Sequence, residues 1–289
     1  PHLGLVVTVL AGIANIFFDF LFIVVIPRGK GAAYGTAIGY CIPAIFGLIF
    51  FSLDRNGSLR FVKPTFDAPV LAHICANGSS EMVTNLSNAV TTLFFNLTML
   101  HYLGEAGVAS ITIALYAQWF LTSIYFGFAS GVAPVFSYNH GCENHEQLHR
   151  IFNISIRFVA ISAVGVVLFA LLACDMLISI FVFPSSEVFS ITCRDLNLFA
   201  TSFLFVGTNI FSSGMFTALS NGKVSAIISF LRTFVFLLLS MFLLPLVMEV
   251  NGIWLTVPVA ELLTLGVSIF LTSFDFVKFI TINFTRFYA

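Results

Sequence analysis

The sequence predicts an all-α polytopic membrane protein with about eight transmembrane helices. Of its 289 residues, 59% are hydrophobic and only 9% are charged, which is too little polar surface to cover a soluble core. Apolar runs long enough to cross a bilayer recur along the whole chain, separated by short polar or glycine-containing segments. The five cysteines are scattered without a C-x-x-C pair, so we expect small buried side chains and no disulfide framework or metal site.

The expected spans follow one another with turn chemistry at most of the breaks. They cover about residues 2–26, 32–52, 68–101, 106–137, 150–182, 188–219, 223–246 and 252–272. The longest polar stretch, DRNGSLRFVKPTFD at 54–67, predicts a linker between two groups of helices. The tail at 273–289 interleaves phenylalanines with basic residues, a pattern typical of an amphipathic segment at the membrane surface.

The basic residues of the loops predict the orientation. One set of loops holds Arg55, Arg60, Lys63, Arg150, Lys223, Lys278 and Arg286, and the other holds Arg28, Lys30 and Arg194. The positive-inside rule places the richer set in the cytoplasm. The linker, the loop at 139–150 and the tail are therefore expected on the cytoplasmic side.

Polar residues within the spans are functional candidates, because each costs free energy unless it is paired or faces water. The helix expected at 68–101 carries a stripe of them: Asn77, Glu81, Thr84, Asn85, Asn88, Thr92 and Asn96. At 100° per residue they fall within about 120° of one face and extend over about 28 Å. We interpret the stripe as the wall of a water-filled cavity; interhelical hydrogen bonds are the alternative.

The first span contains a carboxylate, Asp19, one helical turn after Asn15. Thr36 lies at a similar depth in the second span, because a short turn joins the two. Carboxylate, amide and hydroxyl oxygens can bind Na⁺, and the carboxylate can instead carry a proton. We interpret the three residues as a cation-coupling site; a local hydrogen-bond network around Asp19 is the alternative.

Arg232 and Glu261 lie on neighbouring antiparallel spans, at depths that match to within about 3 Å. They are expected to form a structural ion pair that neutralises two costly charges. HEQLH at 145–149 fits the H-E-x-x-H pattern of zinc metalloproteases. No convincing third ligand follows in a partner helix, so we predict no metal there and keep a membrane metalloprotease only as an alternative.

Several segments together resemble the multidrug and toxic compound extrusion (MATE) transporters. NIFFDFLFI and GKGAAYGTAIG resemble that family's fifth and sixth helices, and KPTFDAPVLAHICANGSSEMVTNLSNAV resembles the start of its second half. GVAPVFSYNHGCENHEQLHR resembles the family's G-x-x-P-x-x-x-Y-N-x-G-A loop, with Cys142 in place of the usual Ala. LSNGKVSAIISFLR and NGIWLTVPVAEL resemble the eleventh and twelfth helices. The match covers nearly the whole chain in the family's order.

The resemblance implies two six-helix bundles, of which this chain would hold the last two helices of the N-terminal one and all of the C-terminal one. It implies an N-terminally truncated chain that lacks about the first four helices. Residues 1–53 are then the end of the N-terminal bundle and 54–67 the cytoplasmic linker. Residues 68–272 are the C-terminal six-helix bundle and 273–289 the tail.

The implied function is export of organic cations and drugs across the plasma membrane in exchange for Na⁺ or H⁺, with no enzyme activity and no other cofactor. Asn15, Asp19 and Thr36 match the family's cation site, and Glu81 matches a carboxylate used in some members, whose partner aspartate is Asn209 here. Glu81, Asn85, Asn88 and Asn209 are therefore expected to line a substrate cavity.

The expected partners are a small cationic or amphipathic substrate and the lipid bilayer, with no nucleic acid, and the expected state is a monomer. The alternative within the superfamily is a flippase for lipid-linked oligosaccharides. A flippase would favour several Arg or Lys residues in the cavity, and this chain has few within its spans.

Overall fold

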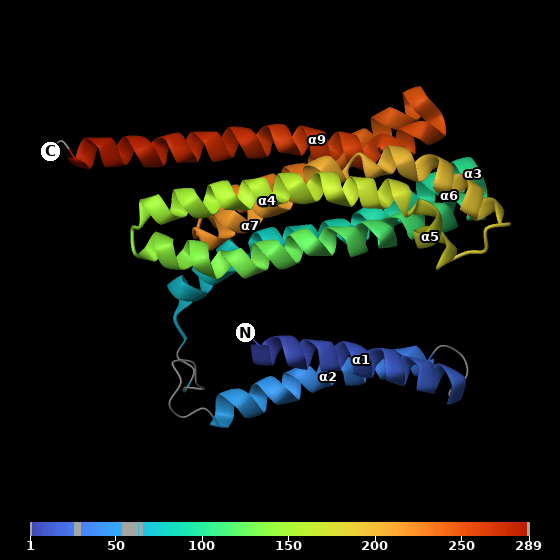
Figure 1. The fold of residues 1–289 in the computed structure, drawn as a ribbon, viewed down its shortest axis with the longest axis horizontal. Helices are drawn as coiled ribbons and strands as arrows, with labels where there is room; N and C mark the ends of the chain where they lie inside the picture. Colours follow the sequence, from blue (N-terminus) through green and yellow to red (C-terminus); the bar gives the residue numbers. More distant parts are fainter. Residues whose placement is uncertain (1, 26–29, 54–62, 64–65, 288–289) are drawn as a thin grey trace. The chain divides into compact units, whose positions relative to one another are not determined.

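The computed structural model describes residues 2–25, 30–53, 63 and 66–287, and the side chains of these residues except 25, 30, 32, 80, 81, 84 and 274–287. All regular structure in this part of the chain is helical (Figure 1). The chain divides into two compact units, Pro1–Asp67 and Ala68–Ala289, which are described separately. Most of the expected linker at 54–67 lies outside the described residues.

Unit 1 is an antiparallel pair of helices, α1 (His2–Val25) and α2 (Lys30–Leu53) (Figure 1). Their contact is a seam of α2 glycines spaced four apart, so that one backbone can approach the other closely. A Cβ atom on any of the three would collide with α1: Gly31 with Phe22, Gly35 with Asp19, and Gly39 with Asn15. The seam therefore fixes which residues of the two helices face each other.

Unit 2 contains the remaining helices. They are α3 (Ala68–Gly141), α4 (His145–Leu172), α5 (Cys174–Ser179), α6 (Glu187–Ala200), α7 (Phe203–Ala218), α8 (Gly222–Phe230), the π-helix η1 (Leu231–Phe236) and α9 (Leu237–Phe287). α3 changes direction at Gly104 (φ 63°, ψ −151°) and α9 at Glu249 (φ 49°, ψ −126°). Both positions fall between spans expected from the sequence. The positive φ at Gly104 favours glycine, because a Cβ strains that conformation.

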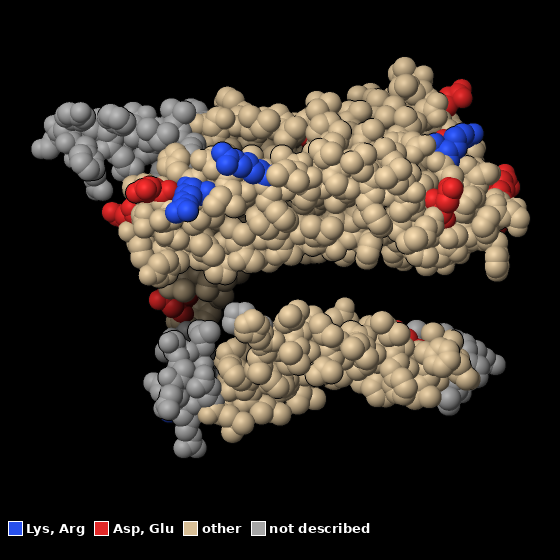
Figure 2. Space-filling view, viewed as in Figure 1, with Lys and Arg blue, Asp and Glu red and all other residues tan. Residues whose placement is uncertain are grey.

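Several of these helices can cross a bilayer. Among the described residues, the segments long and apolar enough are His2–Val24, Ala33–Leu53, Asn85–Gly141, His145–Leu172 and Gly222–Ser273. The pair α6 and α7, bent by 54°, adds a sixth if it forms one span. The segments Asn85–Gly141 and Gly222–Ser273 contain the breaks at Gly104 and Glu249. On the face seen in Figure 2, the charged residues of unit 2 gather toward its two ends, as a bilayer requires.

The structure departs from the expected spans at three places. α4 begins at His145 rather than near residue 150, because the side chain of Asn144 accepts a hydrogen bond from the Gln147 amide (3.2 Å). The expected span 188–219 breaks after Ala200, where the Thr201 hydroxyl donates to the Leu198 carbonyl (2.7 Å). Such bonds compete with the helical pattern. The expected span 223–246 contains the π-helix η1.

The π-helix joins two stretches of helix that pack on different partners. Before it, Ser225 and Ser229 of α8 contact the Ser213 hydroxyl of α7 at 2.8 and 3.2 Å. After it, Leu237 and Met241 join an apolar cluster around Trp254. A second apolar cluster is built around Tyr125 and Phe211. Many other large apolar side chains are exposed on the outside of the helices, where lipid would cover them.

Candidate functional site

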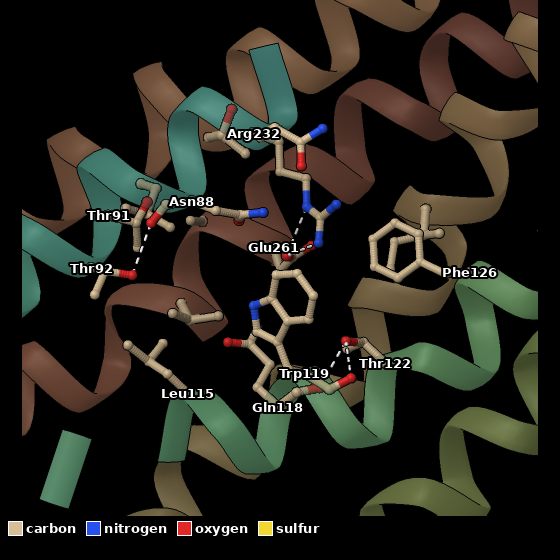
Figure 3. Close-up of a pocket in the computed structure, with 16 residues that line it drawn as sticks. Asn88, Thr91, Thr92, Leu115, Gln118, Trp119, Thr122, Phe126, Arg232 and Glu261 are labelled. Carbon is tan, nitrogen blue, oxygen red and sulfur yellow. Dashed lines mark hydrogen bonds and ion pairs between the residues drawn. The ribbon is translucent and has the colours of Figure 1, made fainter. Parts of the chain in front are cut away.

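A polar cavity of about 320 Å³ lies within unit 2, enclosed by α3, α7, η1 and α9 (Figure 3). Its polar wall consists of Asn85, Asn88, Thr91, Thr92, Gln118, Thr122, Arg232, Thr233 and Glu261. Its apolar wall consists of Leu115, Trp119, Phe126, Ile210, Leu237, Val257 and Ala260. Amides, hydroxyls and aromatic rings thus surround a space in the size range of small-molecule sites.

The polar stripe of α3 supplies only part of this wall. Asn85, Asn88 and Thr92 line the cavity, whereas Asn77 lines a separate hollow with His73 and Ser220. The side chains of Glu81 and Thr84 lie outside the described residues, so the expectation for Glu81 stays a prediction. The Asn96 Oδ1 atom is buried without a hydrogen-bond partner among the described residues.

The second limb of α3 contributes cavity residues that sequence reasoning missed. Gln118 and Thr122 lie one helical turn apart and both line the cavity. Two polar residues four positions apart in an apolar span were the signal in the sequence that could have identified them as cavity residues. The adjacent Trp119 also lines the cavity (Figure 3).

Arg232 and Glu261 form an ion pair on the cavity wall (Figure 3). The Nε and Nη2 atoms of Arg232 donate to Glu261 Oε1 at 2.8 and 2.6 Å. The two side chains are 17% and 6% exposed. The guanidinium gives the buried carboxylate a partner of opposite charge, without which its burial would be costly. We expected this ion pair because the two residues lie at matching depths in their helices.

Asn209 does not line the cavity, contrary to our expectation. Its amide donates to Glu261 Oε2 (2.7 Å) and to the Glu261 backbone carbonyl (2.9 Å), and its Oδ1 accepts from the Ser268 hydroxyl (3.0 Å). The residue is fully buried. Its neighbour Ile210 faces the cavity instead, since successive helical residues point about 100° apart. Asn209 therefore acts behind the wall, by orienting the Glu261 carboxylate.

Unit 1 holds the expected cation-coupling residues. Asn15 and Thr36 line a shared hollow of about 310 Å³, together with Thr8 and Tyr40. Asp19 lies one turn further along α1, packed against Gly35 and not among the residues that line the hollow. Its Oδ1 atom is buried, and no donor among the described residues hydrogen-bonds to it. The structure thus brings Asn15 and Thr36 together and buries one oxygen of Asp19 beside them.

The HEQLH segment opens α4, with Asn144 as its cap. Among the described residues, the ligand atoms of three His, Cys, Asp or Glu side chains come within 4.8 Å of one another only at Cys174, Asp175 and Cys193. Sequence reasoning treated all five cysteines as scattered and buried. Cys41, Cys75 and Cys142 lie on the protein surface, and the packing of α5 on α6 brings Cys174 close to Cys193. The two cysteines lack the C-x-x-C spacing from which such a contact could have been predicted.

The comparisons with known proteins agree on one family. A model of the MatE family matches residues 81–243, more than half of the chain. The multidrug export protein MepA of Staphylococcus saprophyticus is 28% identical over 227 residues, which are 78% of this chain and 48% of that protein. MepA of Staphylococcus aureus strain bovine RF122 is 24% identical over 80% of this chain and 51% of its own length. The chain spans about half the length of these curated relatives.

Solved structures share the fold. A MATE protein crystallised in complex with MaL6 superposes with a TM-score of 0.84 at 20% identity, over 96% of this chain and 63% of that chain. A transporter of the MOP superfamily from Pyrococcus furiosus superposes with a TM-score of 0.84 at 20% identity, over 96% of this chain and 62% of its own. Together with the family match and the apolar helices, these findings establish that the chain belongs to the MATE family of transporters, as a multi-pass protein of the plasma membrane.

Proposed function

We propose that the protein is a secondary active antiporter that exports organic cations and amphipathic drugs in exchange for Na⁺ or H⁺. The relatives named as multidrug export proteins support this class of activity. Within the proposal, residues 1–53 are the last two helices of an N-terminal bundle, and 68–272 form the C-terminal bundle. The linker and the tail are cytoplasmic, and the protein acts as a monomer without catalytic activity.

The observation that carries the proposal is the environment of Asp19. Its Oδ1 atom is buried without a donor among the described residues, against the backbone of α2. An ionised carboxylate in this position has one oxygen away from water and without a described donor, which is costly in a membrane. Binding a proton or a cation removes that cost. The charge of Asp19 therefore changes with occupancy, which is what ion coupling requires.

Asn15 and Thr36 supply neutral oxygens next to this carboxylate. Both line the same hollow, and amide and hydroxyl oxygens are ligands that hard cations accept. A bound ion can shift the balance between two access states only as far as its affinities for them differ. Asp19, through its charge, is the residue that makes this difference large.

The substrate site is the cavity of unit 2. Trp119 and Phe126 offer aromatic faces to a cation, and Asn85, Asn88 and Gln118 offer amide oxygens. The only described carboxylate on the wall, Glu261, is already neutralised by Arg232. A cationic drug is therefore held mainly by ring faces and dipoles, with Glu81 as a further expected contact. Such contacts tolerate many substrate shapes, as multidrug export demands.

The test is ethidium efflux from energised cells that express the complete protein. Asp19→Asn is expected to abolish ion-driven efflux, because the amide keeps the side chain's shape but cannot carry a proton and binds Na⁺ far more weakly. Asn15→Ala is expected to lose less, and Thr36→Ala least, since each removes one neutral oxygen. Substrate binding to the purified Asp19→Asn protein should persist.

Glu187→Gln is the control, because Glu187 is an exposed carboxylate at the start of α6. It should export at the parent rate. Efflux by Asp19→Asn at the rate of the parent protein would show that Asp19 is structural, and coupling would then have to be sought at Glu81.

A further inference from the structure

The thiols of Cys174 and Cys193 and the carboxylate of Asp175 meet where α5 packs on α6. Their ligand atoms lie within 4.8 Å of one another. The Cys193 thiol donates to Asp175 Oδ1 at 3.2 Å. This contact lies at the end of unit 2 opposite the turn between α3 and α4 (Figure 1), and none of the three residues lines the cavity described above.

The two sulfur atoms are held by the packing of the helices. Cys174 is 8% exposed and belongs to the apolar cluster around Trp254, and Cys193 packs against the same cluster. Asp175 is exposed, so its carboxylate can rotate. The two thiols, which are soft ligands, are thus held in place. The carboxylate, which is a hard ligand, is open to water and can adjust its position.

We propose that Cys174, Asp175 and Cys193 bind a thiophilic divalent cation such as Zn²⁺ or Cd²⁺. Thiolate ligands select such ions over Mg²⁺ and Ca²⁺. In a tetrahedral site with Zn–S bonds of about 2.3 Å the ligand atoms lie roughly 3.8 Å apart, and the three ligand atoms here already lie within 4.8 Å of one another. Water completes the fourth position, on the side where Asp175 is exposed.

Binding is a coordination step whose charges balance. Each thiol loses its proton to solvent as its sulfur bonds to the metal, so one divalent ion releases two protons when both thiols start protonated. The carboxylate binds in its ionised form. Affinity should therefore rise with pH, and the bound ion should tie the six-residue helix α5 to α6.

The experiment titrates the purified, fully reduced protein with Cd²⁺ and follows the ultraviolet thiolate-to-cadmium charge-transfer band. We expect one equivalent of Cd²⁺ to saturate the band and to raise the melting temperature. Histidine sites, including those of HEQLH, give no such band, so the signal reports sulfur ligands alone.

Three variants locate the site. Cys193→Ser should lose the band, and Asp175→Asn should weaken Cd²⁺ binding by at least the roughly tenfold loss that removal of an outer-shell partner causes. Because Asp175 is exposed, its variant should fold as the parent does. Cys142→Ser changes an exposed cysteine and should bind as the parent does. The proposal is wrong if the reduced, folded protein shows no band, or if Cys193→Ser and Asp175→Asn both bind Cd²⁺ as tightly as the parent.

Discussion

Close packing around single residues explains both charged sites of this protein. One oxygen of Asp19 is buried because Gly35 has no side chain, so α2 can approach it. Glu261 is held in place because Arg232 and Asn209 occupy its two carboxylate oxygens. The first carboxylate has no described donor on its buried oxygen and the second has a full set. This contrast separates a group suited to exchanging ions from one suited to holding helices together.

Gly35→Ala should destabilise the helix pair of unit 1. The added methyl group would overlap the Asp19 side chain and backbone, and overpacking of this kind costs about 1–3 kcal/mol. The melting temperature of the detergent-purified protein should fall. Gly47→Ala is the matched control on the same helix, because nothing lies within 4 Å of its added Cβ. Equal stability of the two variants would contradict the close approach at Gly35.

The Arg232–Glu261 pair should show strong coupling in a double-mutant cycle. Arg232→Met leaves a buried carboxylate and Glu261→Gln leaves a buried guanidinium, and each loss is expected to cost about 3–5 kcal/mol. The double variant should recover part of this loss, because no unpaired charge remains. Thermal unfolding of all four proteins measures the coupling. Strictly additive losses would mean that the two side chains do not stabilise each other.

Residue positions could be predicted from the sequence wherever depth along a helix was enough. The depths of Arg232 and Glu261 follow from counting residues. Of the three residues expected at one level, Asn15 and Thr36 line a common hollow and Asp19 does not. The helix face proved harder, because one residue turns a side chain by about 100°, and Asn209 faces Glu261 rather than the cavity. The meeting of Cys174 with Cys193 depends on how α5 packs on α6, which no local pattern encodes.

At the scale of elements, the helix α3 has one surface that lines the cavity and another that would face lipid. Asn88 lines the cavity, while Leu97 is 54% exposed on the outside of the same limb. Lipid would cover the outer surface, since the span is apolar enough to lie in a bilayer. Solvent exposure in the absence of lipid therefore does not show which of the two positions contacts water in the membrane. Accessibility to a water-soluble reagent should distinguish them.

Cysteine labelling can measure this difference. In a background where Cys41, Cys75 and Cys142 are serine, Asn88→Cys should react with membrane-impermeant, water-soluble thiol reagents, and Leu97→Cys should be protected. Labelling is carried out in native membranes and read by a mass shift. Equal protection at both positions would remove the support for a water-filled cavity.

The helix boundaries expected from the sequence agree with the structure where a glycine favours a break in the helix. Gly104 ends the first limb of α3 close to the expected break, because its backbone conformation suits glycine. The bend between α6 and α7 and the π-helix η1 were not expected. Neither contains Gly or Pro, and both arise from how hydroxyl groups and packing compete with regular helical hydrogen bonds.

At the scale of the whole molecule, the chain shares its fold with transporters of very different sequence. TM-scores of 0.84 over nearly the full chain were obtained at about 20% identity. The pattern of apolar spans is therefore shared far more widely than individual residues are. The sequence could predict that pattern because a bilayer dictates span length and polarity. It could not predict the contents of the cavity, which depend on side chains from four separate elements.

Replacement of both histidines of HEQLH should leave transport intact. His145→Ala with His149→Ala changes the first turn of α4, whose start is set by the Asn144 cap. Ethidium efflux should remain near the parent level, and metal analysis of the two purified proteins should agree. Loss of efflux together with loss of one equivalent of zinc would instead support the metalloprotease alternative.

The π-helix between α8 and α9 sets the angle between the two faces that flank it. The serines before it face α7, and the apolar residues after it face the cluster around Trp254. Because hydrogen bonds in a π-helix join residues five apart, it turns less per residue than an α-helix, whose residues turn by about 100°. If residues 231–236 became a regular α-helix of the same length, one stretch would rotate against the other, and only one of the two contacts could form. Removal of one residue would offset most of that rotation. A one-residue insertion in this segment should therefore harm the protein more than a one-residue deletion that spares Arg232.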